Sequence, residues 1–262
     1  MKYLNLGCGG TFHKDWVNID YASVSPFVKI HDLSKGIPCD DNSFKLVYHS
    51  HILEHFNQID GIQFLKECYR VTEYDGVIRI VIPDLKETVD EYVEAYKNVK
   101  ENKNDLTRAN YEWAVIELID QFVREESGGE MLRYWAKENI VNTEKLESRV
   151  GSVFYNFKNY KFPEINPPKG FFEKLKAFFL AKTGISWEQY QTMKFYDVGE
   201  RHKWMYDDFS LTELLKEIGY TNITVRDGKT SYVEDWKAYM SLDVEGENIR
   251  IPNSLIIEGI KK

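Results

Sequence analysis

Residues 3–20 read Tyr-Leu-Asn-Leu-Gly-Cys-Gly-Gly-Thr-Phe-His-Lys-Asp-Trp-Val-Asn-Ile-Asp and combine a buried-type strand, a glycine turn and a second strand that ends on Asp20. The first strand, residues 3–6, runs directly into Gly7 and Gly9. Because glycine has no Cβ, backbone N–H groups at such a turn can contact a ligand at the carboxyl edge of a parallel sheet. Asp20, at the end of the next strand, offers a carboxylate to a ribose diol.

The spacing of this turn argues against a dinucleotide ligand. The third glycine of the G-x-G-x-x-G pattern is missing from Gly7-Cys-Gly9-Gly10, and no long helix separates the turn from Asp20. A ligand without a pyrophosphate therefore fits this stretch better.

Short apolar strands continue along the first third of the chain. We predict strands over residues 3–6, 16–19, 27–30, 45–48 and 77–82, and a helix over residues 59–71. Strands that alternate with crossovers indicate a parallel sheet. Only about nine residues join the first two strands, fewer than a helical crossover needs, so we expect part of one face of the sheet to be uncovered.

The pattern changes after Asp84. Residues 85–200 carry helical periodicity, with helices predicted over 86–99 and 106–126, and then an aromatic and basic stretch over 150–196. The first pattern resumes with the N-cap cluster 207–210, a helix over 211–218 and a strand over 222–226. Residues 254–260 alternate and should form a final antiparallel strand.

Five segments in order resemble the class I S-adenosylmethionine (SAM)-dependent methyltransferases, of the type 11 kind. They are Leu4-Asn-Leu-Gly-Cys-Gly9, Val17-Asn-Ile-Asp20, His31-Asp-Leu33, Phe44-Lys-Leu-Val-Tyr48 with Ser50-His-Ile-Leu-Glu-His55, and the helix-and-strand unit 65–83. The motif His202-Lys-Trp-Met-Tyr206 and the closing Pro252-Asn-Ser-Leu-Ile-Ile-Glu258 are similar to a small subgroup associated with bacterial surface-polysaccharide synthesis.

The resemblance implies an α/β fold: a Rossmann-like, doubly wound, seven-stranded sheet in the order 3-2-1-4-5-7-6. Its last strand is antiparallel, and a large, mainly helical insertion follows the fifth strand. Residues 1–84 and 201–262 would form the SAM-binding core, and residues 85–200 an acceptor or lid region, within one catalytic domain overall. At 262 residues and 43% hydrophobic composition, the chain is long enough for such a core with one elaboration.

The cofactor implied by the resemblance is SAM, with S-adenosylhomocysteine as its product. The methionine part would lie near the glycines, the ribose on Asp20, and the adenine against Asp32 and the Leu33 backbone. Alternatively, Asp32 caps a turn before Ser34. The full set of implied cofactor residues is Asn5, Leu6, Gly7, Cys8, Gly9, Asp20, Tyr21, Asp32, Leu33, Ser50 and His51.

Asn5 departs from the family pattern, which usually has an acidic residue two places before the first glycine. An amide accepts hydrogen bonds but offers no full charge to the α-amine of the cofactor. We therefore expect either a lower SAM affinity or another carboxylate in its place.

The methyl group of a sulfonium is already electrophilic, so the protein must mainly align an acceptor in line with the S–CH3 bond and remove its proton. Histidine is the obvious base for a hydroxyl acceptor, because it titrates near neutral pH. We predict His51 as the base and His202 as an acceptor-facing residue. Further catalytic candidates are His55 and Glu54, with Asp84 in reserve.

Two of these residues have competing interpretations. His202 can instead pack or cap the loop before the helix that starts near Asp207. The run from His51 to His55 also matches H-x-x-E-H, a zinc-hydrolase pattern that needs both histidines on one helix face. We assign no metal site, because the strand before this run and the lack of an obvious third ligand favour the methyltransferase motif.

The function predicted from these features is O-methylation of a hydroxyl on a glycan, a nucleotide sugar or another small acceptor, by in-line transfer with a histidine base. Two other functions remain open. One is a SAM-binding protein without catalysis, whose insertion serves as an interaction module. The other is a metal-dependent hydrolase that uses His51, Glu54 and His55.

Composition limits the partners. A net charge of −8, from 42 acidic and 34 basic residues, argues against a nucleic-acid substrate. Three cysteines without a CxxC pair favour the reducing cytoplasm. We expect no signal peptide, because the first strand starts at residue 3, and no membrane-spanning run.

Residues 169–182 form a candidate amphipathic helix. It either lies on a membrane surface or glycolipid, at the inner face of the membrane, or packs as a lid or dimer contact. The chain is expected to be a monomer or a homodimer.

Overall fold

The computed structural model describes residues 2–23, 25–161, 167–197 and 199–262. The chain divides into two compact units. The first, called the core unit, comprises Met1–Asp90 and Lys203–Lys262, and the second, called the helical unit, comprises Glu91–His202.

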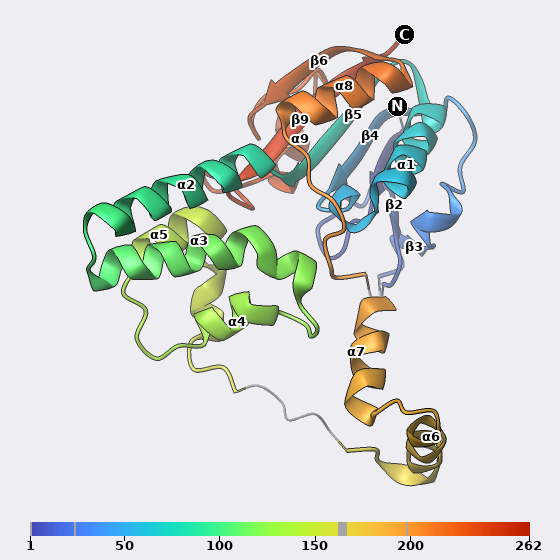
Figure 1. The fold of residues 1–262 in the computed structure, drawn as a ribbon. Coiled ribbons are helices and arrows are strands. Elements are labelled where there is room, and N and C mark those ends of the chain that lie inside the picture. The colour runs from blue at the N-terminus through green and yellow to red at the C-terminus, as the bar shows by residue number, and fades with distance from the viewer. Residues whose placement is uncertain (1, 24, 162–166, 198) are drawn as a thin grey trace. The chain divides into compact units, whose positions relative to one another are not determined.

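The core unit is built on a seven-stranded sheet with the order β3-β2-β1-β4-β5-β9-β6 (Figure 1). Its strands are β1 Tyr3–Leu6, β2 Val17–Asp20, β3 Val28–Ile30, β4 Phe44–Ser50, β5 Thr72–Pro83, β6 Tyr220–Arg226 and β9 Ser254–Lys261. The first five strands are parallel, whereas β9 runs antiparallel to both β5 and β6. This order confirms the predicted sheet, with β9 in the place of the seventh strand.

Two helices cover one face of the sheet, α1 (Gln58–Val71) and α8 (Asp208–Ile218). Their ends follow from local sequence: the Asn57 side chain caps α1, and Asp207 forms a capping box with Ser210 at the start of α8. Apolar side chains from both helices bury the strand residues beneath them in one cluster, which includes Leu65, Leu215 and Ile80. Two short 3-10 helices, η1 (Leu33–Lys35) and η2 (Leu53–His55), follow β3 and β4.

The opposite face has no helical crossover between β1 and β2, as predicted, and it is covered over most but not all of its area. Its cover is the stretch 227–253, which holds α9 (Trp236–Tyr239), η4 (Met240–Leu242) and the hairpin β7 (Val244–Glu245) and β8 (Asn248–Ile249). Trp236 and Leu242 pack on Tyr3, Leu46 and other strand residues. The face stays open only toward the β3 edge, where Ile30 is 62% exposed.

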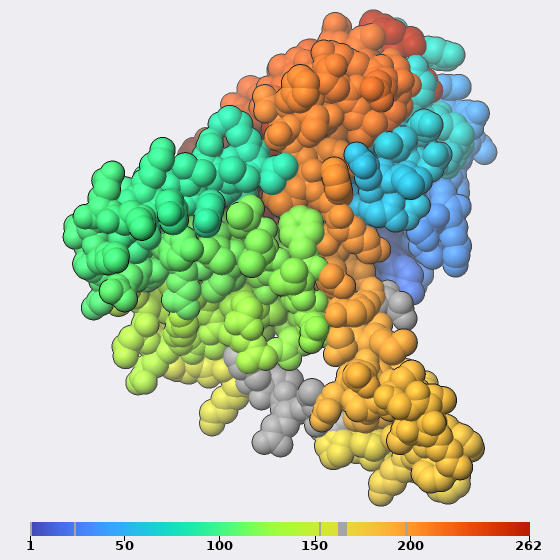
Figure 2. All heavy atoms as spheres, viewed as in Figure 1, coloured from blue at the N-terminus to red at the C-terminus, as the bar shows by residue number. Residues whose placement is uncertain are grey.

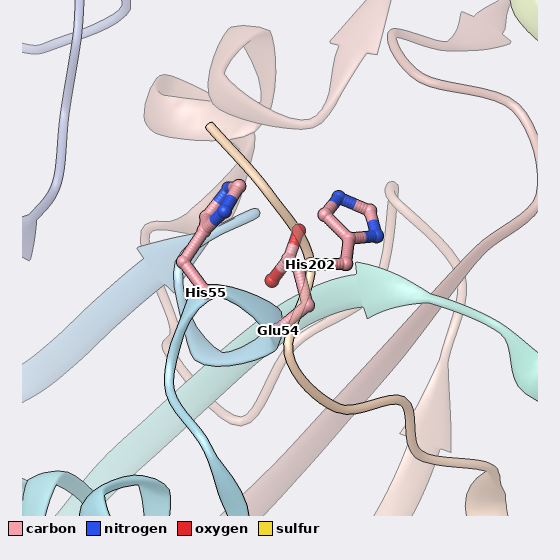
Figure 3. Close-up of side chains that lie close together, drawn as sticks. All are labelled: Glu54, His55 and His202. Atoms are coloured by element: carbon pink, nitrogen blue, oxygen red, sulfur yellow. The ribbon is translucent and has the colours of Figure 1, made fainter. Parts of the chain in front are cut away.

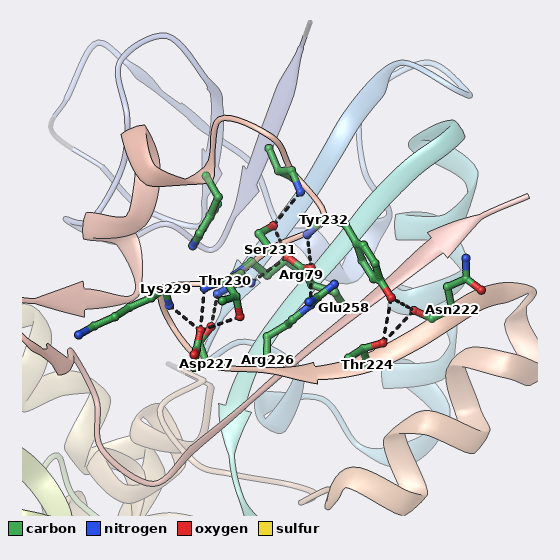
Figure 4. A network of polar contacts seen from close by, with 12 residues as sticks. Arg79, Asn222, Thr224, Arg226, Asp227, Lys229, Thr230, Ser231, Tyr232 and Glu258 are labelled. Atoms are coloured by element: carbon green, nitrogen blue, oxygen red, sulfur yellow. Dashed lines mark hydrogen bonds and ion pairs between the residues drawn. The ribbon is translucent and has the colours of Figure 1, made fainter.

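A buried ionic network attaches this covering stretch to the sheet (Figure 4). Arg79 on β5 is fully buried and donates to Asp243 at 2.7 Å and to Glu258 at 2.8 Å. Its remaining N–H groups donate to the carbonyl oxygens of Thr230 and Asp227. Because every donor of the guanidinium fork has a partner, the charge is tolerated inside the protein.

The helical unit has a small core of its own, formed by Trp113, Met131, Tyr134, Leu146 and Phe154 on the elements between residues 105 and 157. Its elements are α3 Asp105–Val123, α4 Gly129–Trp135, α5 Thr143–Val150, η3 Gly151–Phe157, α6 Gly170–Lys182 and α7 Trp187–Asp197, and helix α2 (Leu85–Glu101) begins in the core unit and continues into it. Among the residues that the structure describes, no helix is long and apolar enough to span a bilayer.

Candidate active site

A cavity of about 190 Å³ lies in the core unit where β1 and β4 end. Both strands are parallel neighbours, so their carboxyl ends meet at one sheet edge, where ligands of open α/β sheets bind. The cavity is lined by Asn5, Gly7, Cys8, Gly9, Gly10, Thr11, Tyr48, Ser50, His51, Leu242, Arg250 and Ile251. Six of the predicted cofactor residues are therefore brought together: Asn5, Gly7, Cys8, Gly9, Ser50 and His51.

The glycine turn joins the first two strands at this edge. Gly7 and Gly9 both have positive φ, at 62° and 51°, which glycine adopts without the steric penalty of a side chain. The Gly7 N–H donates to the Ile19 carbonyl at 2.8 Å, and the Gly9 N–H donates to the Asp20 carboxylate at 2.8 Å. The turn thus holds the Asp20 carboxylate at the tip of β2 next to the cavity.

Asn5 and Cys8 are nearly buried in the cavity wall. Asn5 is 1% exposed, and its amide donates to the Thr11 carbonyl at 3.2 Å. That bond ties the start of the loop after the glycines to β1. Burial raises the pKa of the Cys8 thiol to about 11, so the thiol is uncharged at neutral pH.

The other predicted cofactor residues lie outside the cavity lining. Leu6 is fully buried in the core, and Tyr21, which follows β2, is 70% exposed. Asp32 caps η1, because its carboxylate accepts from the Ser34 N–H at 3.0 Å and from the Ser34 hydroxyl at 2.6 Å. The hydrogen bond from the Ser34 side chain is the main reason that the pKa of Asp32 is lowered. The capping alternative is thus observed, and a contact of Asp32 or Leu33 with adenine stays a prediction.

His51 connects β4 to the C-terminal strand through its ring. Its Nδ1 lies 3.1 Å from a Glu54 carboxylate oxygen, and its Nε2 lies 3.0 Å from the Ser254 hydroxyl oxygen. The positive φ of His51, 53°, and its backbone N–H bond to the Val81 carbonyl hold the residue in this position. A carboxylate on Nδ1 favours the tautomer that carries its proton there and presents Nε2 as a proton acceptor.

Glu54 and His55 project from η2 just after the cavity wall (Figure 3). Glu54 is 1% exposed, and its backbone carbonyl accepts from the N–H groups of Lys203 at 2.7 Å and Trp204 at 3.3 Å. The α-helix that a zinc-binding H-x-x-E-H pattern needs is not formed, because only Leu53–His55 is helical and His51 precedes it with a positive φ. The helical arrangement of His51 and His55 that this pattern requires is therefore absent.

His202 is the last residue of the helical unit. It is 6% exposed; its backbone N–H donates to the Gln121 carbonyl at 2.9 Å, and its ring meets the Phe122 ring edge-on with centroids 6.0 Å apart. The packing alternative is thus observed for His202, and its predicted role facing an acceptor stays a prediction. The reserve residue Asp84 pairs with Tyr206 in an isolated parallel bridge within the core unit.

Sequence reasoning missed the part of the cavity wall formed by Leu242, Arg250 and Ile251. Arg250 is exposed, and it donates to the Ser241 carbonyl at 3.0 Å. These residues carry no motif. They reach the cavity because the stretch 227–253 folds over the sheet and is held there by Arg79.

Comparison with known proteins gives one family match and several similar solved structures. Residues 13–80 match the family model of a methyltransferase domain. No match was found among curated proteins. Similar solved structures include SAM-dependent methyltransferases from Archaeoglobus fulgidus (12% identity, TM-score 0.40, 99% of this chain and 86% of that chain) and Thermotoga maritima (14% identity, TM-score 0.38, 100% and 82%). The family match confirms the predicted methyltransferase resemblance over the matched residues, and it implies SAM as the cofactor.

Proposed function

We propose that this protein binds SAM in the cavity at the ends of β1 and β4 and transfers its methyl group to a hydroxyl of a glycan, a nucleotide sugar or another small acceptor in the cytoplasm. The observation that carries the proposal is that the glycine turn, Asp20 and His51 lie at one sheet edge, and that residues 13–80, which include Asp20 and His51, match a methyltransferase domain. The choice of a glycan or nucleotide-sugar acceptor is more specific than methyl transfer itself, and it rests on the His202–Tyr206 motif.

The cofactor would be held by groups of matching chemistry. The glycine turn, where Gly9 faces open space, suits the methionine part, and Asp20 is the carboxylate for the ribose hydroxyls. Arg250 supplies a cation at the cavity wall for the methionine carboxylate. Asn5 offers its amide oxygen to the α-amine in place of the usual carboxylate.

The base in this proposal is His51. SAM supplies an electrophilic methyl group, so the acceptor oxygen gains a bond to carbon as the sulfur–methyl bond breaks. The acceptor proton passes to Nε2 of His51, and Glu54 stabilises the resulting imidazolium through Nδ1 at 3.1 Å. Ser254, 3.0 Å from Nε2, occupies the position that the acceptor hydroxyl would take or relay through.

The proposal assigns SAM binding and methyl transfer to different residues, and three variants test this division. We expect Asp20→Ala to weaken SAM affinity about 100-fold, because hydrogen bonds to a charged group contribute about 1.5–3 kcal/mol each. His51→Asn should bind SAM within about threefold of the wild type and lose at least about 100-fold in turnover. His202→Ala is also expected to leave SAM binding intact and to lower turnover.

Calorimetry with SAM and S-adenosylhomocysteine measures the first property. Release of S-adenosylhomocysteine in a screen of nucleotide sugars and surface-glycan fragments measures the second. Asp15→Ala, at an exposed carboxylate in the loop before β2, is the matched control and should change neither. Failure of the wild type to bind either ligand at high micromolar concentration would reject the proposal; binding without turnover on any acceptor would favour the non-catalytic alternative.

A further inference from the structure

Helix α6 exposes an apolar face in the part of the helical unit that follows residue 169. Its phenylalanines are largely open to solvent: Phe171 is 74% exposed, Phe172 82%, Phe178 56% and Phe179 57%, and Leu175 is 40% exposed. No residue of the helix is buried. In Figure 2 the α6 segment, coloured amber, lies at the surface. Four exposed phenylalanines on one helix form a far larger apolar patch than single scattered side chains do, and such patches mark interaction sites.

The neighbouring helix leaves this face free. Successive residues of an α-helix are rotated by about 100°, which places the four phenylalanines and Leu175 within an arc of about 120°. Contact with α7 comes from outside this arc: the Lys176 ammonium bonds the Tyr190 hydroxyl at 2.5 Å and lies 4.2 Å from the centre of its ring. The less exposed Ala177 and Leu180 also lie outside the arc.

The charges around the apolar arc are mostly positive. Lys169, Lys174, Lys176 and Lys182 lie on or next to α6, against the single acidic residue Glu173, although the whole chain carries −8. Lys174 lies beyond one edge of the arc and Lys176 beyond the other. Lys182 lies within the arc in the last turn, with its ammonium 4.6 Å from the centre of the Phe178 ring.

We propose that α6 binds the surface of an anionic lipid bilayer, with its phenylalanine face in the interfacial region. A broad aromatic face bordered by lysines is the composition of helices that lie in a membrane interface, where the lysine stems extend toward the lipid phosphates. The lysines favour an anionic lipid surface over a second copy of the chain as the partner of this face. Pairing two α6 helices through it would bring two lysine-rich borders together. The proposal does not depend on methyltransferase activity.

Vesicle co-sedimentation with the full chain tests the proposal without SAM or an acceptor. We expect the protein to sediment with vesicles of phosphatidylglycerol and phosphatidylcholine in equal parts, to bind pure phosphatidylcholine at least about tenfold more weakly, and to dissociate as salt is raised. The double variant Phe171→Ser and Phe172→Ser should lose at least about tenfold in partitioning to the vesicles, because each serine buries much less apolar surface in the lipid than the phenylalanine it replaces.

Two further variants complete the experiment. Phe209→Ser, at a phenylalanine of α8 that is 73% exposed, is the matched control and should bind vesicles like the wild type. Lys174→Glu with Lys182→Glu should reduce the preference for anionic vesicles. Circular dichroism would check that each variant is folded. The proposal is overturned if the wild type ignores anionic vesicles, if the α6 and α8 phenylalanine variants bind equally, or if sedimentation equilibrium shows that the α6 face instead holds a dimer that does not bind lipid.

Discussion

Gly7 and Gly9 share a left-handed backbone conformation but differ in their surroundings. A Cβ on Gly7 would collide with the side chain of Ile52, which packs under the turn. A Cβ on Gly9 would meet no atom within 4 Å, because that glycine faces open space at the cavity. Gly7 is thus required by the fold, whereas Gly9 leaves room for a ligand.

The two alanine variants should therefore fail in different ways. Gly7→Ala adds a steric clash to backbone strain and should lower the free energy of unfolding by about 2–5 kcal/mol. Gly9→Ala adds mainly backbone strain, about 1–2 kcal/mol, but should weaken SAM affinity at least about tenfold. Urea unfolding and calorimetry measure the two quantities. Wild-type SAM affinity in a folded Gly9→Ala protein would place the cofactor elsewhere.

His49 is a fully buried histidine next to the proposed base. Its ring lies 5.1 Å from that of Phe64, and neither ring nitrogen has a hydrogen-bond partner among the described residues. Burial lowers its pKa from 6.5 to about 4, opposed by the nearby charge of Glu54. The residue is therefore neutral in the folded protein at physiological pH.

This pKa difference predicts a pH dependence of stability. Below about pH 6.5 the unfolded chain binds a proton at His49 that the folded protein does not bind until about pH 4. Stability is therefore lost as the pH falls through this window, by up to about 3 kcal/mol at its lower end. His49→Phe should remove this part of the loss. Urea unfolding of both proteins between pH 4 and 7.5 measures it, and parallel curves would contradict the assignment.

At the scale of elements, the stretch 227–253 links the stability of the sheet to the shape of the cavity. It covers one sheet face through Trp236 and Leu242, and it supplies Arg250 to the cavity wall. The Arg79 guanidinium holds this stretch at several points: it bonds Asp243 and the Asp227 carbonyl, and it lies 4.2 Å from the Trp236 ring. A substitution of Arg79 should therefore change the cavity wall at Arg250, although Arg79 itself does not line the cavity.

Arg79→Met leaves the buried Asp243 carboxylate without a cation and Glu258 with only Arg226, and should cost about 3–5 kcal/mol of unfolding free energy, together with weaker SAM binding. Adding Asp243→Asn and Glu258→Gln to the same variant removes the unpaired charges and should restore part of the stability. Arg226→Met is the matched control, because Arg226 is only partly buried and bonds Glu258 at the longer distance of 3.2 Å. Equal losses in Arg79→Met and Arg226→Met would argue against the network as the attachment.

At the scale of the whole molecule, every residue that lines the cavity belongs to the core unit. The chain leaves this unit through α2 and returns at Lys203. The segments where it leaves and returns are neighbours, because the Leu85 N–H donates to the Tyr206 carbonyl at 3.0 Å. A short linker can therefore replace the residues between them.

We expect a chain in which a glycine-serine linker replaces residues 91–202 to unfold cooperatively and to bind SAM within about tenfold of the wild type, because its cavity wall is complete. It should lose acceptor methylation and vesicle binding together, since the proposed acceptor region and α6 are both removed. Calorimetry, the methyl-transfer assay and co-sedimentation measure the three properties. A folded core that no longer binds SAM would show that the cofactor site needs the helical unit.

The elements that the sequence predicted are those with short-range causes. Asn57 and Asp207 mark helix starts through their own side chains, and apolar runs mark strands that are buried on both faces. The glycine turn was predicted for the same reason, because two positive φ angles leave a local glycine pattern, and its contact with a cofactor stays a prediction. The helical cap role of Asp32 was also among the expected alternatives.

The sequence by itself determined the strands, the helix starts and the glycine turn, because periodicity, caps and motifs act within a few neighbouring positions. The strand order was implied by the family resemblance, and the sheet confirms it. Only the tertiary structure decided that residues 227–253 close the second face, that Arg250 joins the cavity wall, and that Ser254 meets His51, which lies 203 positions earlier. Such contacts depend on burial and charge pairing between distant segments. Neither Arg79 nor Ser254 carries a local signal of its partner, so their roles emerge only when the strands are assembled.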